Sequence, residues 1–353
     1  NDAARLVDPD SSIGLASNLW FSIVSVLFLA LVVGFITDRM IAPRLGTYDP
    51  SLAAEGTTTE QGATLSDQES RGLRYAGFGL LGLLVRMHVG PGDPVVTSLG
   101  AYPTFNFHVA GVGGRLVTVP YERDRENLDG LLEAARRENA PLVYLSNPDN
   151  PMGSWWEADE IMRFADALPE TSMLVLDEAY GELGPASALP AIDVSRPNLV
   201  RMRTFSKAYG LAGIRCGYAF GEAREIGDFE KIRNHYGVSR MAQVAGEAAL
   251  ADQAWLAEVV AKVDAGRQRI SAIAVENGLQ PLPSATNFVT IDCGGDGDFA
   301  GKVMQAMLSR DVFIRKPMVP VLDRCIRVSV GLDHELDIFA EELPGALAAA
   351  RGN

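Results

Sequence analysis

From Leu83 onward, the chain alternates short β-rich runs with amphipathic helical stretches. This alternation is typical of an α/β fold in which helices connect parallel strands. The runs that we predict to be strands are, in chain order, Pro94–Thr97, Arg115–Val119, Leu142–Leu145, Met173–Leu176 and Leu199–Arg203. A long helical stretch, Met241–Asn277, then leads to strands near Asn287–Ile291 and Ile326–Val330. We therefore expect a large domain with a mostly parallel sheet and a smaller C-terminal α/β domain.

The N-terminal part has a different pattern. No charged residue occurs from Ile13 to Thr37, and Leu19–Ile36 is almost entirely apolar. Its length suits a transmembrane helix, which we favour over a buried soluble helix because no polar stripe is present. A signal peptide fits less well, since no basic region precedes the run. Aspartates precede the run and arginines follow it, so the positive-inside bias predicts that the remainder faces the cytoplasm, anchored to the inner membrane. These residues are Asp2, Asp8, Asp10, Arg39, Arg44, Arg71 and Arg74.

Two further segments precede the α/β pattern. Tyr48–Ser70 is rich in Thr, Ser, Gly, Glu and Gln, which predicts a flexible connector. The apolar run Tyr75–Val85 is too short to span a bilayer. We therefore divide the chain into four segments, namely a membrane-helix segment (1–46), a linker (47–75), a large domain (76–250) and a small C-terminal domain (251–353).

Composition narrows the function. The 353 residues are 47% hydrophobic and 22% charged, which is typical of a folded chain with room for two domains. The formal net charge of -14 argues against nucleic-acid binding, because that needs a clustered basic surface. Cysteines and histidines are few and dispersed, so they predict neither a disulfide framework nor a metal site. They are Cys216, Cys293, Cys325, His88, His108, His235 and His334.

Polar segments follow the predicted strands. Ligands of α/β sheets bind beyond the carboxyl ends of the strands, so functional residues are expected in these segments. The segments are Gly100–Phe105 (GAYPTF), Asn147–Gly153 (NPDNPMG), Asp177–Tyr180 (DEAY) and Thr204–Lys207 (TFSK).

Lys207 is the first candidate, because lysine amines form Schiff bases and an unpaired buried amine is costly. Taken alone, it would more often be a surface lysine. Asp177 follows an apolar run and could keep a cationic ring nitrogen protonated, or it could cap a helix. Tyr180 could place a phenol beside a ring oxygen, or serve as ordinary half-buried packing.

Four more residues accompany them. Asn150 lies between two prolines that rigidify its loop, which suits a fixed amide donor, although an Asn in such a loop is usually only a turn residue. Arg215 heads the β-rich run Ile214–Phe220, and its guanidinium could bind a phosphate bidentately. Thr204 and Ser206 offer hydroxyls nearby, or act as turn residues.

Four motifs then occur in one order along the chain. They are NPDNPMG at Asn147, DEAY at Asp177, TFSKAYGLAGIRCG at Thr204 and IRVSVG at Ile326. Together they resemble the fold-type I aminotransferases of class I and II that use pyridoxal 5'-phosphate (PLP), most closely the histidinol-phosphate aminotransferase branch. The resemblance extends from Leu83 to the C-terminus. It implies a homodimer that exchanges an amino group between an amino acid or amino-phosphate and a 2-oxo acid.

The resemblance also implies a role for each residue. Lys207 would form the Schiff base with PLP and act as general acid and base, while Asp177 would pair with the pyridine nitrogen. Asn150 and Tyr180 would hold the ring oxygen, Arg215, Thr204 and Ser206 would bind the phosphate, Tyr102 would stack on the ring, and Arg327 would grip the substrate's α-carboxylate. Without the resemblance, Arg327 would be interpreted as a surface strand residue. Arg315 is a further candidate for a phosphate-bearing substrate.

The N-terminal part carries a second resemblance. Residues 35–46 (FITDRMIAPRLG) and 71–76 (RGLRYA) resemble the aminobenzoyl-glutamate transporter family, over roughly residues 1–82. One piece of a transporter lacks the paired halves that transport needs, so we expect at most a membrane anchor, or a fusion. It stands where aminotransferases carry an N-terminal arm and a phosphate-binding turn, so we expect reduced activity. A PLP-dependent decarboxylase or lyase on the same fold, and an inactive membrane-anchored fusion, are the alternative hypotheses.

Overall fold

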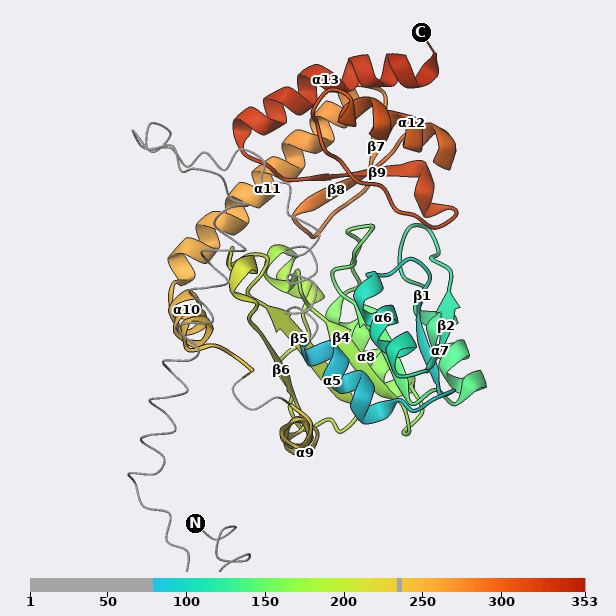
Figure 1. Ribbon diagram of the computed structural model, residues 1–353, viewed down its shortest axis with the longest axis vertical. Coiled ribbons are helices and arrows are strands. Elements are labelled where there is room, and N and C mark those ends of the chain that lie inside the picture. The colour runs from blue at the N-terminus through green and yellow to red at the C-terminus, as the bar shows by residue number, and fades with distance from the viewer. Residues whose placement is uncertain (1–78, 234–236, 353) are drawn as a thin grey trace, which may run out of the picture. The chain divides into compact units, whose positions relative to one another are not determined.

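The computed structural model describes residues 79–233 and 237–352. Figure 1 shows this part of the chain as a large sheet with helices, joined through α11 to a smaller sheet with helices. The expected membrane segment 1–46 and the linker 47–75 lie outside the described residues. Among the helices that are described, none combines the length and the apolar character needed to cross a bilayer.

Within the described residues, six strands form the larger sheet, in the order β2-β1-β3-β4-β5-β6. Their bounds are β1 Pro94–Ser98, β2 Arg115–Val119, β3 Leu142–Ser146, β4 Met173–Asp177, β5 Leu199–Thr204 and β6 Gly217–Gly221. The first five run parallel and β6 pairs antiparallel with β5. The predicted strands therefore form, and the mostly parallel α/β fold is confirmed.

Helices cover both faces of this sheet and bury apolar side chains against it. On one face, α5 (Gly79–His88) and α6 (Pro103–Gly111) pack on β1, β3, β4 and β5. On the other face lie α7 (Leu128–Glu138) and α8 (Ala158–Ala167). In α7 the buried residues Leu131, Ala134 and Ala135 follow helical spacing, and the Asn127 side chain caps the helix by accepting the Gly130 N–H.

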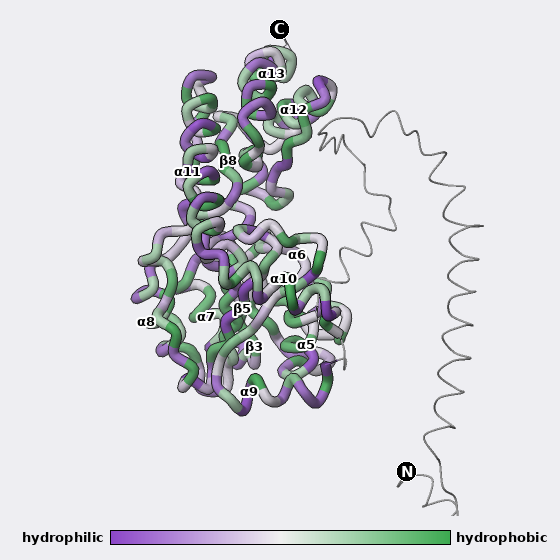
Figure 2. Tube along the Cα trace, turned by 90° about the vertical axis from the view of Figure 1, so that its left-hand side faces the viewer, coloured by the Kyte–Doolittle hydropathy of each residue, from purple (hydrophilic) through white to green (hydrophobic). Residues whose placement is uncertain are grey.

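The C-terminal part contains a second sheet, antiparallel and ordered β7-β8-β9. Its elements are α10 Arg240–Ala251, α11 Gln253–Glu276, β7 Gln280–Pro281, β8 Phe288–Asp292, α12 Gly297–Leu308, β9 Cys325–Ser329 and α13 Asp333–Arg351. Short helices are α9 Ala223–Asp228 and the 3₁₀ turns η3 Gly181–Leu183, η4 Ala186–Ala188, η5 Ala212–Ile214, η6 Phe229–Lys231 and η7 Leu322–Arg324. Along α12 and α13, hydrophilic and hydrophobic positions alternate, as Figure 2 shows.

The helical stretch predicted over Met241–Asn277 forms two helices, α10 and α11. The helix is interrupted at Asp252, which has φ -91° and ψ 70° and therefore leaves the helical region. The Asp252 side chain accepts the Trp255 N–H at 3.0 Å and caps α11. An Asp preceding a new helical turn is a favoured N-cap, so α10 and α11 are separate helices.

The two faces of the smaller sheet differ in chemistry, because side chains alternate along a strand. Val289 and Ile291 of β8 pair with Val328 and Ile326 of β9, and these four side chains pack under α11, α12 and α13. The intervening pair, Thr290 and Arg327, therefore projects from the opposite face. The Thr290 hydroxyl donates to the Pro151 carbonyl at 2.8 Å, so this face meets the loops at the carboxyl ends of the larger sheet.

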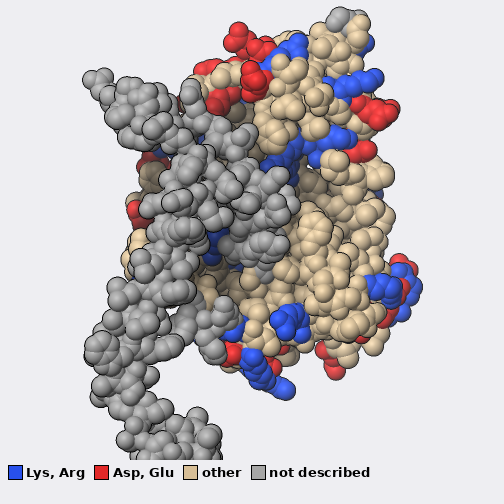
Figure 3. Space-filling view, in the orientation of Figure 1, with Lys and Arg blue, Asp and Glu red and all other residues tan. Residues whose placement is uncertain are grey.

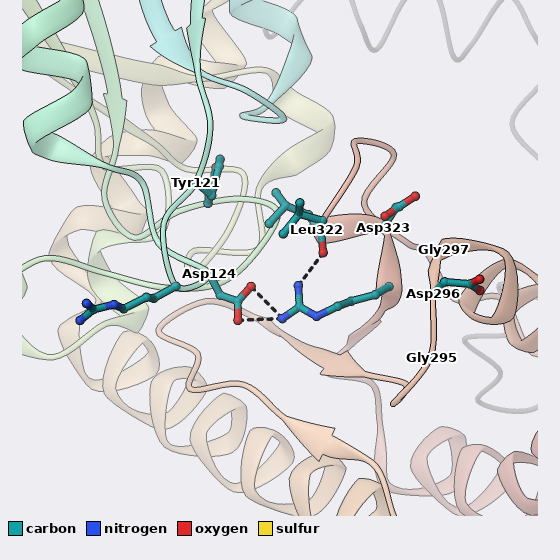
Figure 4. Close-up of a pocket in the computed structure, with 10 residues that line it drawn as sticks. Tyr121, Asp124, Gly295, Asp296, Gly297, Leu322 and Asp323 are labelled. Carbon is teal, nitrogen blue, oxygen red and sulfur yellow. Dashed lines mark hydrogen bonds and ion pairs between the residues drawn. The ribbon is translucent and has the colours of Figure 1, made fainter.

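A second set of contacts joins the sheets at one side of this junction. The Arg324 guanidinium donates to both oxygens of Asp124, at 2.9 Å each, and to Asp292 at 2.7 Å. Beside these groups lies a cavity of about 430 Å³, seen in Figure 4, which Tyr121, Leu322 and glycines of the α12 entry also line. None of the predicted site residues lines this cavity.

A close approach of backbone and side chain completes the junction. Gly100 has φ +100°, and a Cβ at this position would lie 2.5 Å from Val319 Cγ2. Only glycine combines that conformation with that contact. The turn before Tyr102 is therefore packed directly on the loop that precedes η7.

The most deeply buried charges form one network beside the sheet. The Arg201 Nη2 lies 2.7 Å from Glu178 Oε1, and the side chains are 2% and 0% exposed. Arg203 donates to the other oxygen of Glu178 at 3.0 Å. Arg203 also lies 3.7 Å from Glu182, whereas Glu178 is the carboxylate that the structure gives Arg201, so removing the Glu178 charge leaves the buried Arg201 without its counter-charge.

We therefore expect Glu178→Gln to lower the free energy of unfolding of the cofactor-free chain by about 3–5 kcal/mol. Urea unfolding followed by tryptophan fluorescence measures this loss. Glu258→Gln is the matched control, because Glu258 pairs with Lys262 at 2.6 Å on the surface, where a pair contributes about 0–1 kcal/mol. Equal losses in the two variants would contradict the interpretation.

Candidate active site

Lys207 lies in the turn that follows β5, at the carboxyl edge of the larger sheet. Its Nζ is 5.1 Å from the centre of the Tyr180 ring. Burial lowers the pKa of Lys207, and the neighbouring Tyr102 and Asp177 partly oppose this shift. Arg327 and Arg215 lower the same pKa further. The amine therefore lies among residues from four different segments, all of which were predicted from the sequence.

Asp177 is the last residue of β4 and is held on both oxygens. Its Oδ2 accepts the hydroxyl of Tyr144 at 2.6 Å, and its Oδ1 accepts the Ala179 N–H at 3.0 Å. Burial raises the pKa of Asp177, while the Tyr144 hydroxyl, the Ala179 N–H and the Lys207 amine act in the opposite direction. The carboxylate is thus fixed in place beside a cation.

Tyr180, Asn150 and Arg327 form one continuous contact. Asn150 Nδ2 donates to the Tyr180 oxygen at 3.3 Å, and Arg327 Nη1 donates to Asn150 Oδ1. Phe288 supports the ends of this contact, since its ring meets Tyr180 edge to face at 5.7 Å and lies 4.7 Å from the Arg327 guanidinium carbon. Burial raises the pKa of Tyr180 well above its ordinary value, so its phenol remains a hydrogen-bond donor.

Arg215 lies beside the two predicted hydroxyl residues. It has φ 53°, an uncommon conformation for a residue other than glycine, and its Nη1 donates to Ser206 Oγ at 3.4 Å and to the Ala212 carbonyl at 2.5 Å. The Ser206 N–H donates to Thr204 Oγ1 at 3.1 Å. The Arg215 Nε is buried and has no hydrogen-bond partner among the described residues. A buried donor without a partner fits a bound anion such as a phosphate.

Tyr102 differs from the other candidates because its side chain is 46% exposed. It directly precedes α6, whose first residue is Pro103. Its phenol is among the neighbours that act on the Lys207 pKa.

The structure adds residues that the sequence interpretation missed. Tyr144 lies inside the predicted strand Leu142–Leu145 and was not named as a site residue, yet it contacts Asp177. Asp149 lies inside the NPDNPMG motif and is 1% exposed. It accepts the Tyr121 hydroxyl at 2.8 Å and the Met152 N–H at 3.0 Å. A polar residue at an inward position of a buried strand or loop was the available signal in both cases.

Basic side chains gather near the junction of the two sheets, although the chain as a whole is acidic. On the face seen in Figure 3, Lys and Arg lie between the part that carries α12 and α13 and the part that carries β1 and β2. Arg315 contributes to this group, since it forms an antiparallel bridge with Arg327, with Arg315 N donating to the Arg327 carbonyl at 3.0 Å. Paired strand residues project to the same side of the sheet, and the charge of Arg315 lowers the pKa of Arg327.

The buried Asp149 carboxyl generates a pH prediction. Burial raises the pKa of Asp149 to about 7, above the ordinary 3.8. The folded chain therefore holds this proton more tightly than the unfolded chain, and the contribution of Asp149 to stability declines as pH rises from about 4 to about 7. Asp149→Asn should consequently gain stability relative to the parent chain as pH rises through this window.

Urea unfolding of the two chains between pH 5 and pH 8 measures the difference. Asp193→Asn is the control, because hydrogen bonds from Ser195 lower the pKa of the exposed Asp193 carboxyl and its effect falls below this range. A difference between Asp149→Asn and parent that stays constant with pH would refute the assignment.

A parallel sheet flanked by helices on both faces, with a lysine, an aspartate and an arginine at its carboxyl edge, defines a fold-type I PLP-dependent aminotransferase. Comparison with known proteins agrees, since the family model for aminotransferase class I and II matches residues 65–343. The chain belongs to this family. It is a PLP-dependent aminotransferase that acts on small-molecule amino and oxo acids. The match begins before Leu83, where the sequence resemblance began.

Relatives support the same branch. Histidinol-phosphate aminotransferase 2 of Ralstonia nicotianae is 35% identical over 274 residues, covering 77% of this chain and 73% of the relative. Histidinol-phosphate aminotransferase of Rhodospirillum rubrum is 34% identical over 278 residues, covering 77% and 74%. A solved structure of histidinol-phosphate aminotransferase from Sinorhizobium meliloti with pyridoxal-5'-phosphate is 53% identical, with a TM-score of 0.75 and coverage of 81% of this chain and 83% of that chain.

The N-terminal part matches a different family. The model for the AbgT transporter family covers residues 1–98, which agrees with the second resemblance in the sequence. This match overlaps the aminotransferase match between residues 65 and 98. Residues before 79 lie outside the described part of the chain, so the expected anchor at 13–37 stays a prediction.

Proposed function

We propose that this chain transaminates histidinol phosphate with a 2-oxo acid as the other partner, using Lys207 as its catalytic amine. The observation that carries the choice of substrate is the adjacent pair of arginines, Arg315 and Arg327, beside the Lys207 site. One guanidinium suffices for a carboxylate, whereas two neighbouring guanidiniums suit the double charge of a phosphate. The names of the relatives point to the same substrate.

The residues present fit PLP. Arg215, with its unpaired buried Nε, would bind the phosphate together with Thr204 and Ser206. Asp177 would pair with the pyridine nitrogen, while Asn150 and Tyr180 would donate to the ring oxygen. Tyr102 would cover the ring. When bound, PLP supplies an electron sink that makes the α-proton of the substrate amine acidic.

The chain's own residues then handle the protons. Burial lowers the pKa of Lys207, so its Nζ is more readily neutral and can act as a nucleophile and as a base. The same Nζ would accept the α-proton of the substrate and would then donate a proton to complete the transfer. Asp177 beside it remains paired with the donors Tyr144 and Ala179, which favour its charged form.

Arg327 and Arg315 would orient the other end of the substrate. Arg327 is bound to Asn150 Oδ1 and lies over Phe288, so its guanidinium is held in one direction. Arg315 is exposed. Burial is the largest cause that lowers the pKa of Arg327, and the charge of Arg315 lowers this pKa further. An incoming anion relieves this repulsion, which favours binding of a group with more than one negative charge.

The alternatives have less support. Among the structural neighbours, L-threonine-O-3-phosphate decarboxylase from Porphyromonas gingivalis is 20% identical with a TM-score of 0.62, a likeness that concerns the fold alone. The relatives from Ralstonia nicotianae and Rhodospirillum rubrum, at 35% and 34% identity, are both named histidinol-phosphate aminotransferases. A decarboxylase is therefore the less favoured reading, and an inactive fusion is tested by the cofactor experiment below.

We also propose that the chain forms a homodimer. Apolar side chains are exposed on α10 and at its ends, which is unusual for a surface that faces only water. They are Val238, Met241, Val244, Leu250 and Trp255, with Met241 77% exposed. The positive-inside pattern continues to predict that the aminotransferase part faces the cytoplasm.

Lys207→Ala tests the catalytic assignment. PLP added to the parent chain should give a visible absorbance band that depends on pH, because Lys207 Nζ is linked to PLP. The alanine variant should retain only the spectrum of noncovalently bound PLP. The spectra are compared after removal of free PLP. Identical spectra would remove Lys207 from the site, and absence of any band in the folded parent would favour the inactive reading.

Arg315→Gln tests the substrate. Loss of one charge-assisted contact should raise the apparent dissociation constant for histidinol phosphate on the order of tenfold. The constant is measured from the absorbance change of the PLP-loaded chain on addition of the amine. Arg310→Gln is the control, because Arg310 pairs with Glu342 at 3.3 Å away from the site. A change below about twofold in Arg315→Gln, or an equal change with histidinol that lacks phosphate, would rule out the phosphate role.

A further inference from the structure

Tyr144 is a wholly buried tyrosine whose hydroxyl lies 2.6 Å from Asp177 Oδ2. The strand register creates this contact. In the parallel pairing of β3 with β4, Tyr144 aligns with Val175, two residues before Asp177. Residues two apart project from the same face, so both side chains reach the carboxyl edge on one side of the sheet.

The Tyr144 ring is fixed by its packing. Phe105 of α6 stacks on it, with ring centroids 4.4 Å apart and an angle of 18° between the planes. Phe105 is itself fully buried in the core between α5, α6 and the sheet. The hydroxyl cannot turn away from Asp177 without disrupting this stack, so the donor stays in place.

Asp177 needs such a donor. Burial raises the pKa of the Asp177 carboxyl, which favours the neutral form. The hydrogen bond from Tyr144 is the largest of the opposing influences, ahead of the Ala179 N–H and the Lys207 amine. A ring nitrogen stays protonated only when the carboxylate beside it is charged, because a more basic carboxylate would take the proton itself.

We propose that Tyr144 is a positioning residue for the cofactor site, whose hydroxyl donates to Asp177 Oδ2 and maintains the charged carboxylate that a protonated pyridine nitrogen requires. This inference rests on the proposed function, in which Asp177 pairs with that nitrogen. Tyr144 acts through Asp177. It differs in this from a tyrosine that only fills the core.

The test is Tyr144→Phe, which removes one oxygen and keeps the stacking ring. In the PLP-loaded full chain, we expect the midpoint of the pH-dependent absorbance change to move to higher pH. A ring nitrogen that is less firmly protonated withdraws fewer electrons from the Lys207 linkage, which then holds its own proton more tightly. A tenfold change in proton affinity corresponds to roughly one pH unit. The dissociation constant for PLP should rise on the order of tenfold, from loss of a charge-assisted hydrogen bond.

Tyr121→Phe is the matched control. It also removes a buried phenol from a buried carboxylate, since Tyr121 donates to Asp149 at 2.8 Å. We expect a similar loss of thermal stability in both cofactor-free variants, with a smaller change of the absorbance midpoint in Tyr121→Phe, because Tyr121 donates to Asp149 and not to Asp177. If Tyr144→Phe loses stability but keeps the parent midpoint and PLP affinity, the Tyr144 hydrogen bond serves only the core and the proposal is overturned.

A double variant tests whether Tyr144 acts through Asp177. Asp177→Asn and Tyr144→Phe/Asp177→Asn should share one midpoint, since the hydroxyl has no carboxylate left to influence. An additional shift in the double variant would refute the coupling. If Tyr144→Phe does not fold, 3-fluorotyrosine at position 144 provides a stronger donor of the same shape, and the midpoint should then move to lower pH. An unchanged midpoint would again overturn the proposal.

The parent chain separates this inference from the proposed function. If the folded parent shows no Lys207-dependent band with PLP, the proposed function fails. If the parent shows that band and Tyr144→Phe shows the parent's midpoint and affinity, only the role of Tyr144 fails.

Discussion

The rest of this structure depends on one constraint, the burial of charged side chains at the carboxyl edge of the larger sheet. Asp177, Lys207 and Arg327 each carry a charge that burial disfavours, as the directions of their pKa shifts indicate. Each is tolerated because a neighbour supplies a counter-charge, a donor to the carboxylate or an acceptor for the guanidinium. The alternation of the smaller sheet brings Arg327 to this edge, and the order of strands brings Asp177 and Lys207 together. The fold therefore creates the site and must also stabilise it.

Much of this arrangement could be predicted from the sequence. The parallel strands were predicted because β-rich runs of about five residues alternate with helical periods, and the site residues because each follows such a run. The ordered motifs identified the family. Residue spacing alone could not show that Arg327 faces Asn150, since that contact joins residues 177 positions apart. It depends on which face of β9 the surrounding apolar residues bury.

Two features of the structure were not predicted, and both have physical explanations. The helical stretch over Met241–Asn277 divides into two helices, because one capping side chain at Asp252 is enough to begin a new helix. Tyr144 was not among the predicted site residues, because a tyrosine in an apolar strand usually packs in the core. Its hydroxyl oxygen is a single polar atom, whereas the apolar ring dominates the hydropathy pattern. Buried polar atoms of this kind become visible only when the neighbouring strand is placed in register.

The glycine at position 100 has a mechanical consequence. A larger residue would place a deformable side chain between the turn before Tyr102 and Val319, and its rotamers would absorb small movements. At Gly100 the main chain itself meets Val319. Any displacement of the loop before η7 toward the larger sheet is therefore passed to the backbone that carries Tyr102. Through this contact, the position of the smaller sheet influences the position of the turn before Tyr102.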